Sequence, residues 1–361
     1  MLYARNLFSV LHINCRSLYK NYIEIETLLQ SFLFKFKIIA LTETWFNSED
    51  NVDRLFEDYI YKGTSRTGKR GGGVGFCIHN QISFNVRHDL HVFNDLCESF
   101  FIEIPKRGKN LLIGVFYRPP SYSIDQFVHV LTQSLNDIES EHKDCILLGD
   151  FNVDLTKVDV SNSVNVFLES LYSCSFYPLI EHPTRITETS ATLIDNIFVN
   201  FSHDILSGTI LSDISDHLPI FSCFDFIFND KWSLSVKRRN MCTLNFNKFI
   251  CKLSKLNFNY HITSMSDPNV IYDDFIKKVS LLYESCFPLE ECIIKQCNEK
   301  WFTSDLKKMS SKKDCLYRKC LKHPSDYRKR IYKLFKNKYV KAIKKAKRIF
   351  LYRNSTPSRG T

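Results

Sequence analysis

Five short polar segments stand at the ends of apolar runs in the first part of the chain. They are His12-Ile13-Asn14, Thr42-Glu43-Thr44-Trp45, Tyr117-Arg118-Pro119-Pro120, Gly149-Asp150-Phe151-Asn152 and Ser215-Asp216-His217. In addition to these five segments, a single polar residue, Asp195, lies inside an apolar run, where a carboxylate is costly unless it is paired. Carboxylates, amides and an imidazole are together the groups with which a protein can hydrolyse a phosphodiester with the help of a metal ion.

The carboxylates divide between two tasks in such a reaction. Mg²⁺ takes oxygen ligands from one or two carboxylates, a role that Glu43 can fill with Asn14 or Asp216 beside it. We expect Mg²⁺ here, with Mn²⁺ as the alternative. The attacking water needs a carboxylate that aligns it or accepts its proton, and Asp150 suits that role.

The negative charge of the transition state calls for fixed donors and positive charge. His217, Asn152 and Tyr117 are the candidates beside the metal ion. In Asp150-Phe151-Asn152 the spacing of two directs both polar side chains to one side of an extended chain, with Phe151 on the other. A histidine that has to stay cationic needs an anionic partner, so a buried Asp195 is the natural partner for His217.

These residues require strands to position them, and the pattern supplies such strands. Strands are predicted at 7–13, 37–41, 74–79, 99–104, 111–117, 145–148, 193–199 and 218–224. Helices are predicted at 19–34, 124–138 and 163–172. Strands separated both by turns and by helices favour an α/β fold of mixed sheets covered by helices.

The charge of the 361-residue chain reverses sign along its length. Residues 1–230 carry a net charge of −11 and residues 231–361 a net charge of +21. We predict three parts: a catalytic domain at 1–228, a linker with a weakly structured helical segment at 229–299, and a basic helical arm at 300–361. A basic arm suits a polyanion such as DNA, or RNA. The candidate contacts are Arg118, Lys69, Arg70, Lys333, Lys336, Lys344 and Lys345.

Several classes of protein are disfavoured by the composition. No run of apolar residues is long enough for a membrane-spanning helix, and we expect no membrane partner. The thirteen cysteines are scattered, without a CxxC pair, which favours free thiols over disulfide partners and an intracellular location.

Two other motifs resemble known sites but do not fit their structural context. Gly63 to Lys69 follows the phosphate-loop pattern, but Arg70 stands where a Ser or Thr hydroxyl is needed, and a strand follows in place of a helix. A hairpin turn at 61–73 explains it better. Tyr272-Asp273-Asp274 lacks the third carboxylate of a polymerase metal site.

As an ordered set, the polar segments resemble the signature of the endonuclease/exonuclease/phosphatase superfamily. The resemblance covers about residues 6–225 and rests on Asn14, LTETW, YRPP, GDFN, LIDNIF and SDH. The forms LTETW, GGGVGF, YRPP, GDFN and SDHLPI are most similar to the endonuclease domain of non-LTR (LINE-type) retrotransposon polyproteins. The tail similarly resembles the segment that leads to their reverse transcriptase, which is missing here.

The resemblance implies a four-layer α/β sandwich of the DNase I type, with the site at one edge of two facing sheets. It implies a Mg²⁺-dependent nick in DNA that leaves a 3′-hydroxyl, and a nuclear location. Glu43 would be the principal metal ligand with Asn14 as its neighbour, and Asp150 would activate the water. Asn152 and Tyr117 would contact the phosphate, and Asp195 would orient a cationic His217.

Two alternatives remain open. Other substrates of the superfamily are inositol phosphates, sphingomyelin and RNA. The basic arm favours DNA over a soluble inositol phosphate, and a membrane-lipid enzyme would need a hydrophobic anchor segment, which the sequence does not show. The chain could also be a catalytically idle, nucleic-acid-binding remnant.

Overall fold

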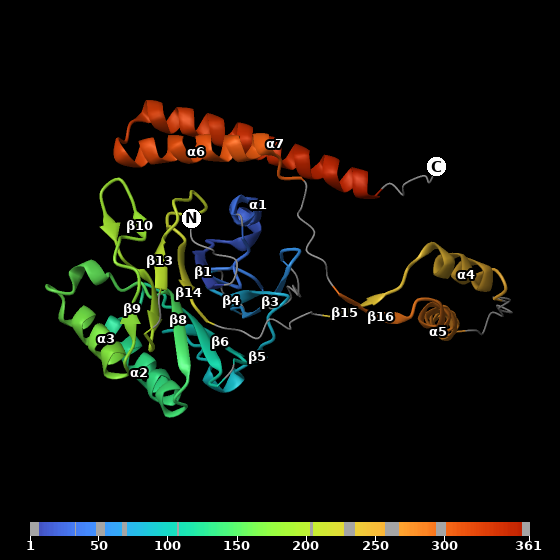
Figure 1. Ribbon diagram of the computed structural model, residues 1–361, viewed down its shortest axis with the longest axis horizontal. Coiled ribbons are helices and arrows are strands. Elements are labelled where there is room, and N and C mark those ends of the chain that lie inside the picture. The colour runs from blue at the N-terminus through green and yellow to red at the C-terminus, as the bar shows by residue number, and fades with distance from the viewer. Residues whose placement is uncertain are drawn as a thin grey trace. The chain divides into compact units, whose positions relative to one another are not determined.

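The fold is described from a computed structural model. It covers residues 7–32, 34–47, 55–66, 71–106, 108–202, 205–226, 235–256, 267–293 and 301–355. Two compact units share the chain: residues 1–230 together with 299–361 form the first, and residues 231–298 form the second. The basic arm therefore belongs to the same unit as the sheets (Figure 1).

Two six-stranded sheets form the centre of the first unit. One has the order β13-β14-β1-β2-β4-β3, with bounds Ile205–Thr209, Ile220–Phe224, Phe8–Asn14, Ile38–Thr42, Val74–His79 and Tyr59–Thr64. The other has the order β5-β6-β7-β8-β12-β9, with bounds Asn85–Val86, Glu98–Ile104, Leu111–Tyr117, Asp144–Asp150, Asp195–Val199 and Tyr177–Pro178. A short hairpin, β10 (Arg185–Ile186) with β11 (Ala191–Thr192), stands apart.

Strands buried on both faces explain why the two sheets pack together. Along β1, Val10 points into the core between the sheets, whereas Leu11 and Ile13 point to the opposite side, against α1. This alternation follows from the two-residue period of a strand. Burial of apolar side chains on both faces stabilises the sandwich by about 25 cal/mol per Å² of apolar surface.

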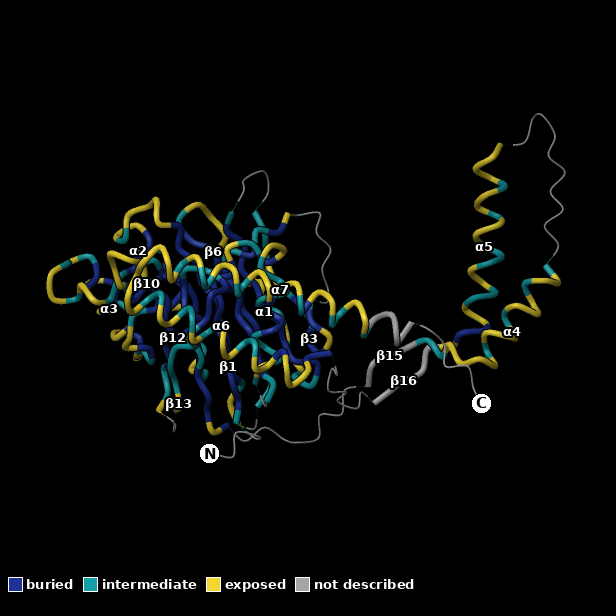
Figure 2. Tube along the Cα trace, turned by 90° about the horizontal axis from the view of Figure 1, so that it is seen from above, coloured by how far each residue is buried: buried dark blue, intermediate teal, exposed yellow. Residues whose placement is uncertain are grey.

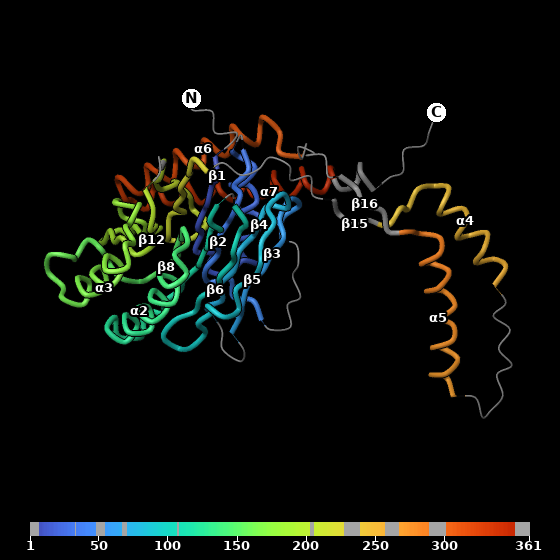
Figure 3. Tube along the Cα trace, turned by 60° about the horizontal axis from the view of Figure 1, so that its bottom comes forward, coloured from blue at the N-terminus to red at the C-terminus, as the bar shows by residue number. Residues whose placement is uncertain are grey.

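Helices cover the outer faces of both sheets. On one side α1 (Leu18–Ser31) packs on β1 and β2. On the other side α2 (Ile124–Ser140) and α3 (Asn162–Ser173) pack on β7 and β8 (Figure 3). Short 3-10 helices lie at His88–Leu90 and Leu155–Lys157. The predicted four-layer α/β sandwich of DNase I type is therefore confirmed.

Two parallel strand pairs determine where the polar segments meet. β1 is parallel to β2, with Asn14 opposite Thr42, and β7 is parallel to β8, with Tyr117 opposite Asp150. Parallel strands end at the same edge of a sheet, so the polar residues that follow them converge. β12 runs antiparallel to β8 and places Asp195 directly opposite Asp150.

The C-terminal arm of the first unit is a helical hairpin of α6 (Ser304–Lys322) and α7 (Asp326–Ser355). Its buried residues form a small core of their own, which includes Trp301, Tyr339 and Ile343, and Ile23 of α1 packs against that core. The hairpin thus packs on the helix layer of the first sheet, with its outer side exposed (Figure 2).

The second unit contains two helices and a two-stranded sheet. Its elements are β15 (Ser235–Arg239), α4 (Thr243–Leu253), α5 (Pro268–Cys286) and β16 (Leu289–Ile293). Tyr272-Asp273-Asp274 lies within α5, and Asp267 caps the start of that helix through a hydrogen bond to the backbone N–H of Asn269.

Three features bear on the disfavoured classes and on the motif that resembles a phosphate loop. Within the described residues, no helix is both long enough and apolar enough to cross a bilayer. Every cysteine whose side chain is described is free. The glycine-rich segment that resembles a phosphate loop connects β3 to β4, which pair antiparallel, so it opens no helix.

Candidate active site

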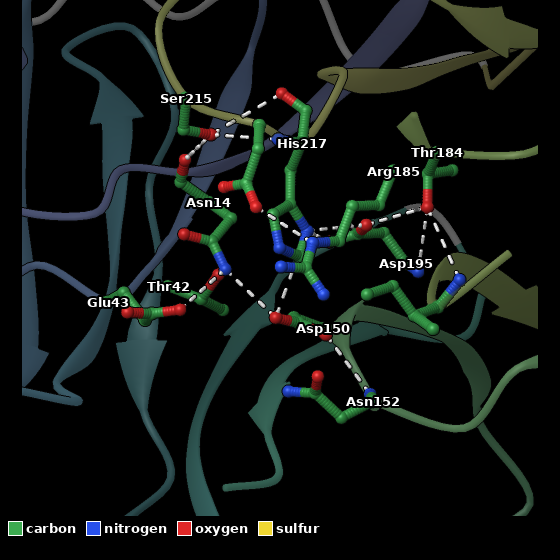
Figure 4. Close-up of polar contacts among 12 residues, drawn as sticks. Asn14, Thr42, Glu43, Asp150, Asn152, Thr184, Arg185, Asp195, Ser215 and His217 are labelled. Carbon is green, nitrogen blue, oxygen red and sulfur yellow. Dashed lines mark hydrogen bonds and ion pairs between the residues drawn. The ribbon is translucent and has the colours of Figure 1, made fainter. Parts of the chain in front are cut away.

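The side chain of Asn14 joins two carboxylates at the edge of the sandwich. Its Nδ2 donates to Glu43 Oε1 at 3.0 Å and to Asp150 Oδ2 at 2.9 Å (Figure 4). Asn14 and Asp150 are almost fully buried, whereas Glu43 is half-buried and reaches solvent. The other oxygen of Glu43 accepts a hydrogen bond from Trp45 Nε1 at 3.2 Å. Two acids therefore face one polar hydrogen-bond donor.

A histidine–aspartate pair lies beside this bridge. His217 Nδ1 is 2.9 Å from Asp195 Oδ2 and 3.1 Å from Oδ1, and it is 3.9 Å from Asp150 Oδ2. Both members of the pair are buried. The contact expected between Asp195 and His217 is present.

The site carries more negative than positive charge, and the pKa values follow from that. Burial raises the pKa of Asp150, and the charge of Asp195 raises it further, to about 7. Burial would lower the pKa of His217, but the charge and hydrogen bond of Asp195 outweigh that and raise it to about 9. At neutral pH, His217 is therefore a cation and Asp150 can exchange a proton.

Two residues without a role in the predicted site lie beside Asp195, and one of them, Thr184, hydrogen-bonds it. Thr184 Oγ1 donates to Asp195 Oδ2 at 2.7 Å and accepts from the backbone N–H of Asp195. His12 lies on the other side, with Nδ1 3.9 Å from Asp195 Oδ1 and Nε2 3.0 Å from Thr42 Oγ1. Burial lowers the pKa of His12 to about 4, so it is neutral. His12 lies within an apolar strand, and this pattern could have predicted a buried polar contact for it.

The backbone around the site is held in uncommon conformations. Glu43 has φ 51° and Asn152 has φ 48°, in the left-handed region that costs side-chain-bearing residues energy. Gly149 precedes Asp150 with φ 153°, and a Cβ there would lie 1.9 Å from the carbonyl oxygen of Phe116. Glycine is therefore required for β8 to pass β7 closely and place Asp150.

The two predicted phosphate contacts, Tyr117 and Asn152, differ in how far they are buried. Tyr117 is buried at the end of β7, where burial raises the pKa of its hydroxyl, with the charge of Glu43 as the next cause. Asn152 is half-buried, and its side-chain amide donates to the carbonyl of Arg118 at 2.8 Å. Both lie at the same edge as Asp150, since Tyr117 pairs with Asp150 and Asn152 follows it.

Arg118 differs from its predicted role as a nucleic-acid contact. Only 3% of its surface is exposed, and its guanidinium donates to the carbonyls of Phe151, Asn152, Pro119 and Tyr122. Four of its five N–H donors are taken by backbone carbonyls and the side chain is buried, so little of the guanidinium is left for a phosphate to contact. Its place in the structure is instead that of a brace which fixes the loop after Asp150.

Asp216, predicted as a metal neighbour, points to two arginines. Its Oδ1 accepts from Arg16 at 2.6 Å and its Oδ2 from Arg185 at 2.8 Å. Burial would raise the pKa of Asp216, but the hydrogen bond from Arg185 and the neighbouring positive charges lower it. Ser215 in the same loop donates to the carbonyl of Asn14 at 2.9 Å and so holds this loop against β1.

The predicted basic contacts on the arm fall into two groups. Lys333, Lys344 and Lys345 are exposed on α7. Lys336 is half-buried and lies 2.9 Å from a carboxylate oxygen of Asp213, so the structure places it in an internal ion pair. Lys69 and Arg70 lie outside the described residues.

The donor set fits a divalent cation of the magnesium class. A buried aspartate and a half-exposed glutamate that share one amide donor offer the hard oxygens and the negative charge such an ion requires. Asp150, Asp195 and His217 also lie close enough together to hold an ion. However, a protonated His217 cannot be a ligand. Glu43, with Asn14 as its neighbour, is therefore the better candidate to hold the ion, which leaves Asp150 free to act on a water.

Residues 11–217 match the model of the endonuclease/exonuclease/phosphatase family. No curated protein matches the sequence.

Solved structures similar to this chain include three nucleic-acid enzymes. The endonuclease domain of TRAS1, a telomere-specific non-LTR retrotransposon, is 14% identical, with a TM-score of 0.46 over 61% of this chain and 99% of that one. AP endonuclease LMAP from Leishmania major is 13% identical, with a TM-score of 0.49 over 61% and 88%. The 3′ phosphatase NExo from Neisseria, bound to a product DNA hairpin, is 16% identical, with a TM-score of 0.46 over 61% and 100%. The family model spans more than half of this sequence, and the chain belongs to the endonuclease/exonuclease/phosphatase family.

Proposed function

We propose that this chain is a Mg²⁺-dependent DNA endonuclease that makes single-strand nicks with 3′-hydroxyl ends. The observation that carries the proposal is the pairing of two arrangements at one edge of the sandwich. One is Glu43–Asn14–Asp150, and the other is Asp195–His217 beside it. The first can hold a cation and a water, and the second supplies a fixed positive charge.

The roles of the residues follow from their charge and position. Asp150, with its pKa raised towards neutrality, accepts the proton of the attacking water. His217, kept cationic by Asp195, faces a non-bridging oxygen of the phosphate and stabilises the charge that develops there. A Mg²⁺ ion held by Glu43 with Asn14 would supply Lewis-acid stabilisation of the same charge.

The proposed 3′-hydroxyl end defines which bond of the phosphodiester breaks. Oxygen of the water forms a bond to phosphorus, and the bond between phosphorus and O3′ breaks. The leaving O3′ takes a proton and becomes the 3′-hydroxyl, and the 5′ side retains the phosphate. Tyr117 and Asn152, at the same sheet edge as Asp150, would contact the phosphate, and the amide of Asn152 is oriented by its hydrogen bond to the carbonyl of Arg118.

The choice of DNA rests on the motifs shared with LINE-type endonuclease domains and on the basic arm. Soluble inositol phosphates offer no long array of phosphates for such an arm to contact. A retroelement endonuclease of this kind would act on chromosomal DNA, in the nucleus.

The test is conversion of supercoiled plasmid to the open-circular form by the full chain, since the arm packs on the catalytic unit. We expect nicking with Mg²⁺, slower or comparable nicking with Mn²⁺, none with EDTA, and loss in His217→Ala. Extension of the nick by a DNA polymerase detects the 3′-hydroxyl. Wild type that is folded but inactive on plasmid would instead support the idle, nucleic-acid-binding alternative.

A further inference from the structure

The basic residues of the α6–α7 hairpin divide into an inward and an outward set. Four lysines between 301 and 350 are not exposed, and each forms a salt bridge to an acid of the sheet-bearing part of the unit. They are Lys313 and Lys336 with Asp213, Lys329 with Glu188, and Lys347 with Glu26. The inward charge of the hairpin is therefore used for docking.

Docking is also apolar. Tyr339 and Ile343 on α7 are 3% and 1% exposed, and Ile23 of α1 packs against the cluster that contains them. The hydroxyl of Tyr332 adds a hydrogen bond to Asp213. Because apolar burial and a buried ion network act together, the hairpin is held in one position on the unit and does not behave as a free tether.

The exposed lysines and arginines on the outer side of the hairpin form no such salt bridges within the described residues. Fourteen lysines and arginines between 301 and 350 are exposed, against two exposed acids, Asp305 and Asp326. None of the fourteen forms a salt bridge within the part of the chain that the structure describes. Lys341 and Lys345 stand four apart on α7, a spacing at which like charges destabilise a helix. Helix stability therefore does not explain this composition.

The α6–α7 hairpin contacts the loop that carries Asp216 and His217. Asp213, which takes two of the inward lysines, stands three residues before Asp216 in the loop that ends in His217. Lys329 reaches Glu188, between β10 and β11, and Arg185 of β10 bonds Asp216. The outward residues next to Lys329 are Arg328, Arg330 and Lys333, so this end of the strip of outward basic residues is the end nearest the loop that carries His217. Figure 1 shows the turn between α6 and α7 close to β10.

We propose that the outward face of the docked α6–α7 hairpin is a second phosphate-binding surface that grips the DNA duplex flanking the nick. The proposal rests on the proposed nuclease function for its choice of duplex DNA. The 30 residues of α7 span about 45 Å, which corresponds to roughly 13 base pairs of duplex. The near end of this strip is Arg328, Arg330 and Lys333, and the far end is Lys341, Lys344 and Lys345.

The test measures binding separately from cleavage. The full chain carrying Asp150→Asn is titrated with a 30-base-pair duplex by fluorescence anisotropy at several salt concentrations, and footprinted with hydroxyl radicals. Three variants are compared: a near triple (Arg328, Arg330 and Lys333 to Gln), a far triple (Lys341, Lys344 and Lys345 to Gln), and a control triple on exposed basic residues of the second unit (Lys248, Lys252 and Lys255 to Gln).

Each strip triple should make the slope of log K against log salt shallower by about 2 to 3, because each phosphate that the protein no longer neutralises reduces the slope by about 0.9. The control should leave the slope unchanged. Because the hairpin is docked, the far triple should remove only the protection most distant from the active site. A control triple as damaging as the strip triples would overturn the proposal, as would strip triples without effect, or a single-stranded RNA of equal length bound more tightly through the same residues. The proposed nuclease function fails separately, through an inactive wild type on plasmid.

Discussion

Asp150 and Asp213 are both buried aspartates of the same unit, yet their protonation behaves in opposite ways. Burial raises the pKa of each, but around Asp213 the charges of Lys313 and Lys336 outweigh burial and lower the pKa to about 2. Around Asp150 the charge of a second aspartate, Asp195, adds to burial and outweighs the cationic His217, so the pKa of Asp150 is raised to about 7. The two residues are 1% and 7% exposed, so burial alone does not separate them.

The sign of the surrounding charge therefore distinguishes a structural aspartate from a reactive one in this fold. Asp213 forms ion pairs with Lys313 and Lys336 and accepts a hydrogen bond from Tyr332, so its carboxylate is satisfied within the protein. Asp150 and Glu43 share the single neutral amide of Asn14, and His217 is committed to Asp195. Two carboxylates without a cationic partner of their own within the described residues, one of them with a raised pKa, can bind a cation and accept a proton.

The largest effect should come from neutralising Asp150. We expect Asp150→Asn to lower the rate of plasmid nicking by about 10³-fold, because the variant has no carboxylate to accept the proton of water. Its free energy of unfolding should not fall, since the change removes a buried charge next to Asp195. Nicking assays with urea denaturation of the same preparations check both. A variant with full activity would contradict the assigned role.

The next effect should come from the partner of the histidine. Asp195→Asn removes the charge that raises the pKa of His217, so the cation should be lost at a lower pH than in wild type. Wild-type activity should fall as the pH rises through about 9, and in Asp195→Asn this fall should move towards neutrality. At neutral pH the variant should lose about 10- to 100-fold in rate. An alkaline limb that does not move would show that His217 is not the group titrating.

Asp213→Asn should reverse this pattern by affecting stability more than chemistry. Leaving two lysines without their buried partner should cost about 3 kcal/mol, while nicking should fall by less than tenfold. The folded pKa of Asp213, about 2, lies below its ordinary value, so its stabilisation is present above about pH 4 and is lost as pH falls towards 2. Protease sensitivity of α6–α7 should therefore increase in wild type over that range, and the variant should be sensitive throughout. Equal sensitivity of the two at pH 7 would show that Asp213 does not hold the hairpin.

The sequence predicted the strands that lie deep in the sandwich. The bounds of β4 and β7 agree to the residue, because both strands are buried on both faces and read as unbroken apolar runs. β5, β9 to β11, β13, β15 and β16 were missed. β5 and β9 to β11 are each two residues long and contain no buried residue, so neither apolar content nor period distinguishes them from loops. β3, at the edge of its sheet, was read only as part of a turn.

The polar site was predictable to different degrees. Asp195 stood out because an acid within an apolar strand needs a partner, and the arrangement of the strands supplies His217. Arg118 could not be read correctly, since an arginine that bonds four backbone carbonyls looks in sequence like any basic residue. The same holds for Lys336, whose acidic partner is 123 residues away along the chain.

The smallest effect should come from Thr184, which supports Asp195 without carrying charge. Thr184→Val removes the hydroxyl that donates to Asp195 Oδ2 and accepts from the backbone N–H of Ile194 and Asp195. We expect a loss of about 1 to 2 kcal/mol in the free energy of unfolding and a few-fold loss in nicking rate.

Thr184→Ser is the matched control, because it retains the hydroxyl and loses only a methyl group. If orientation of Asp195 is what Thr184 provides, the serine variant should recover most of the rate, and the alkaline limb of the valine variant should shift less than that of Asp195→Asn. Urea denaturation and the pH profile of nicking separate the two effects. A serine variant as slow as the valine variant would mean that packing of the methyl group, and not the hydrogen bond to Asp195, is what the site requires.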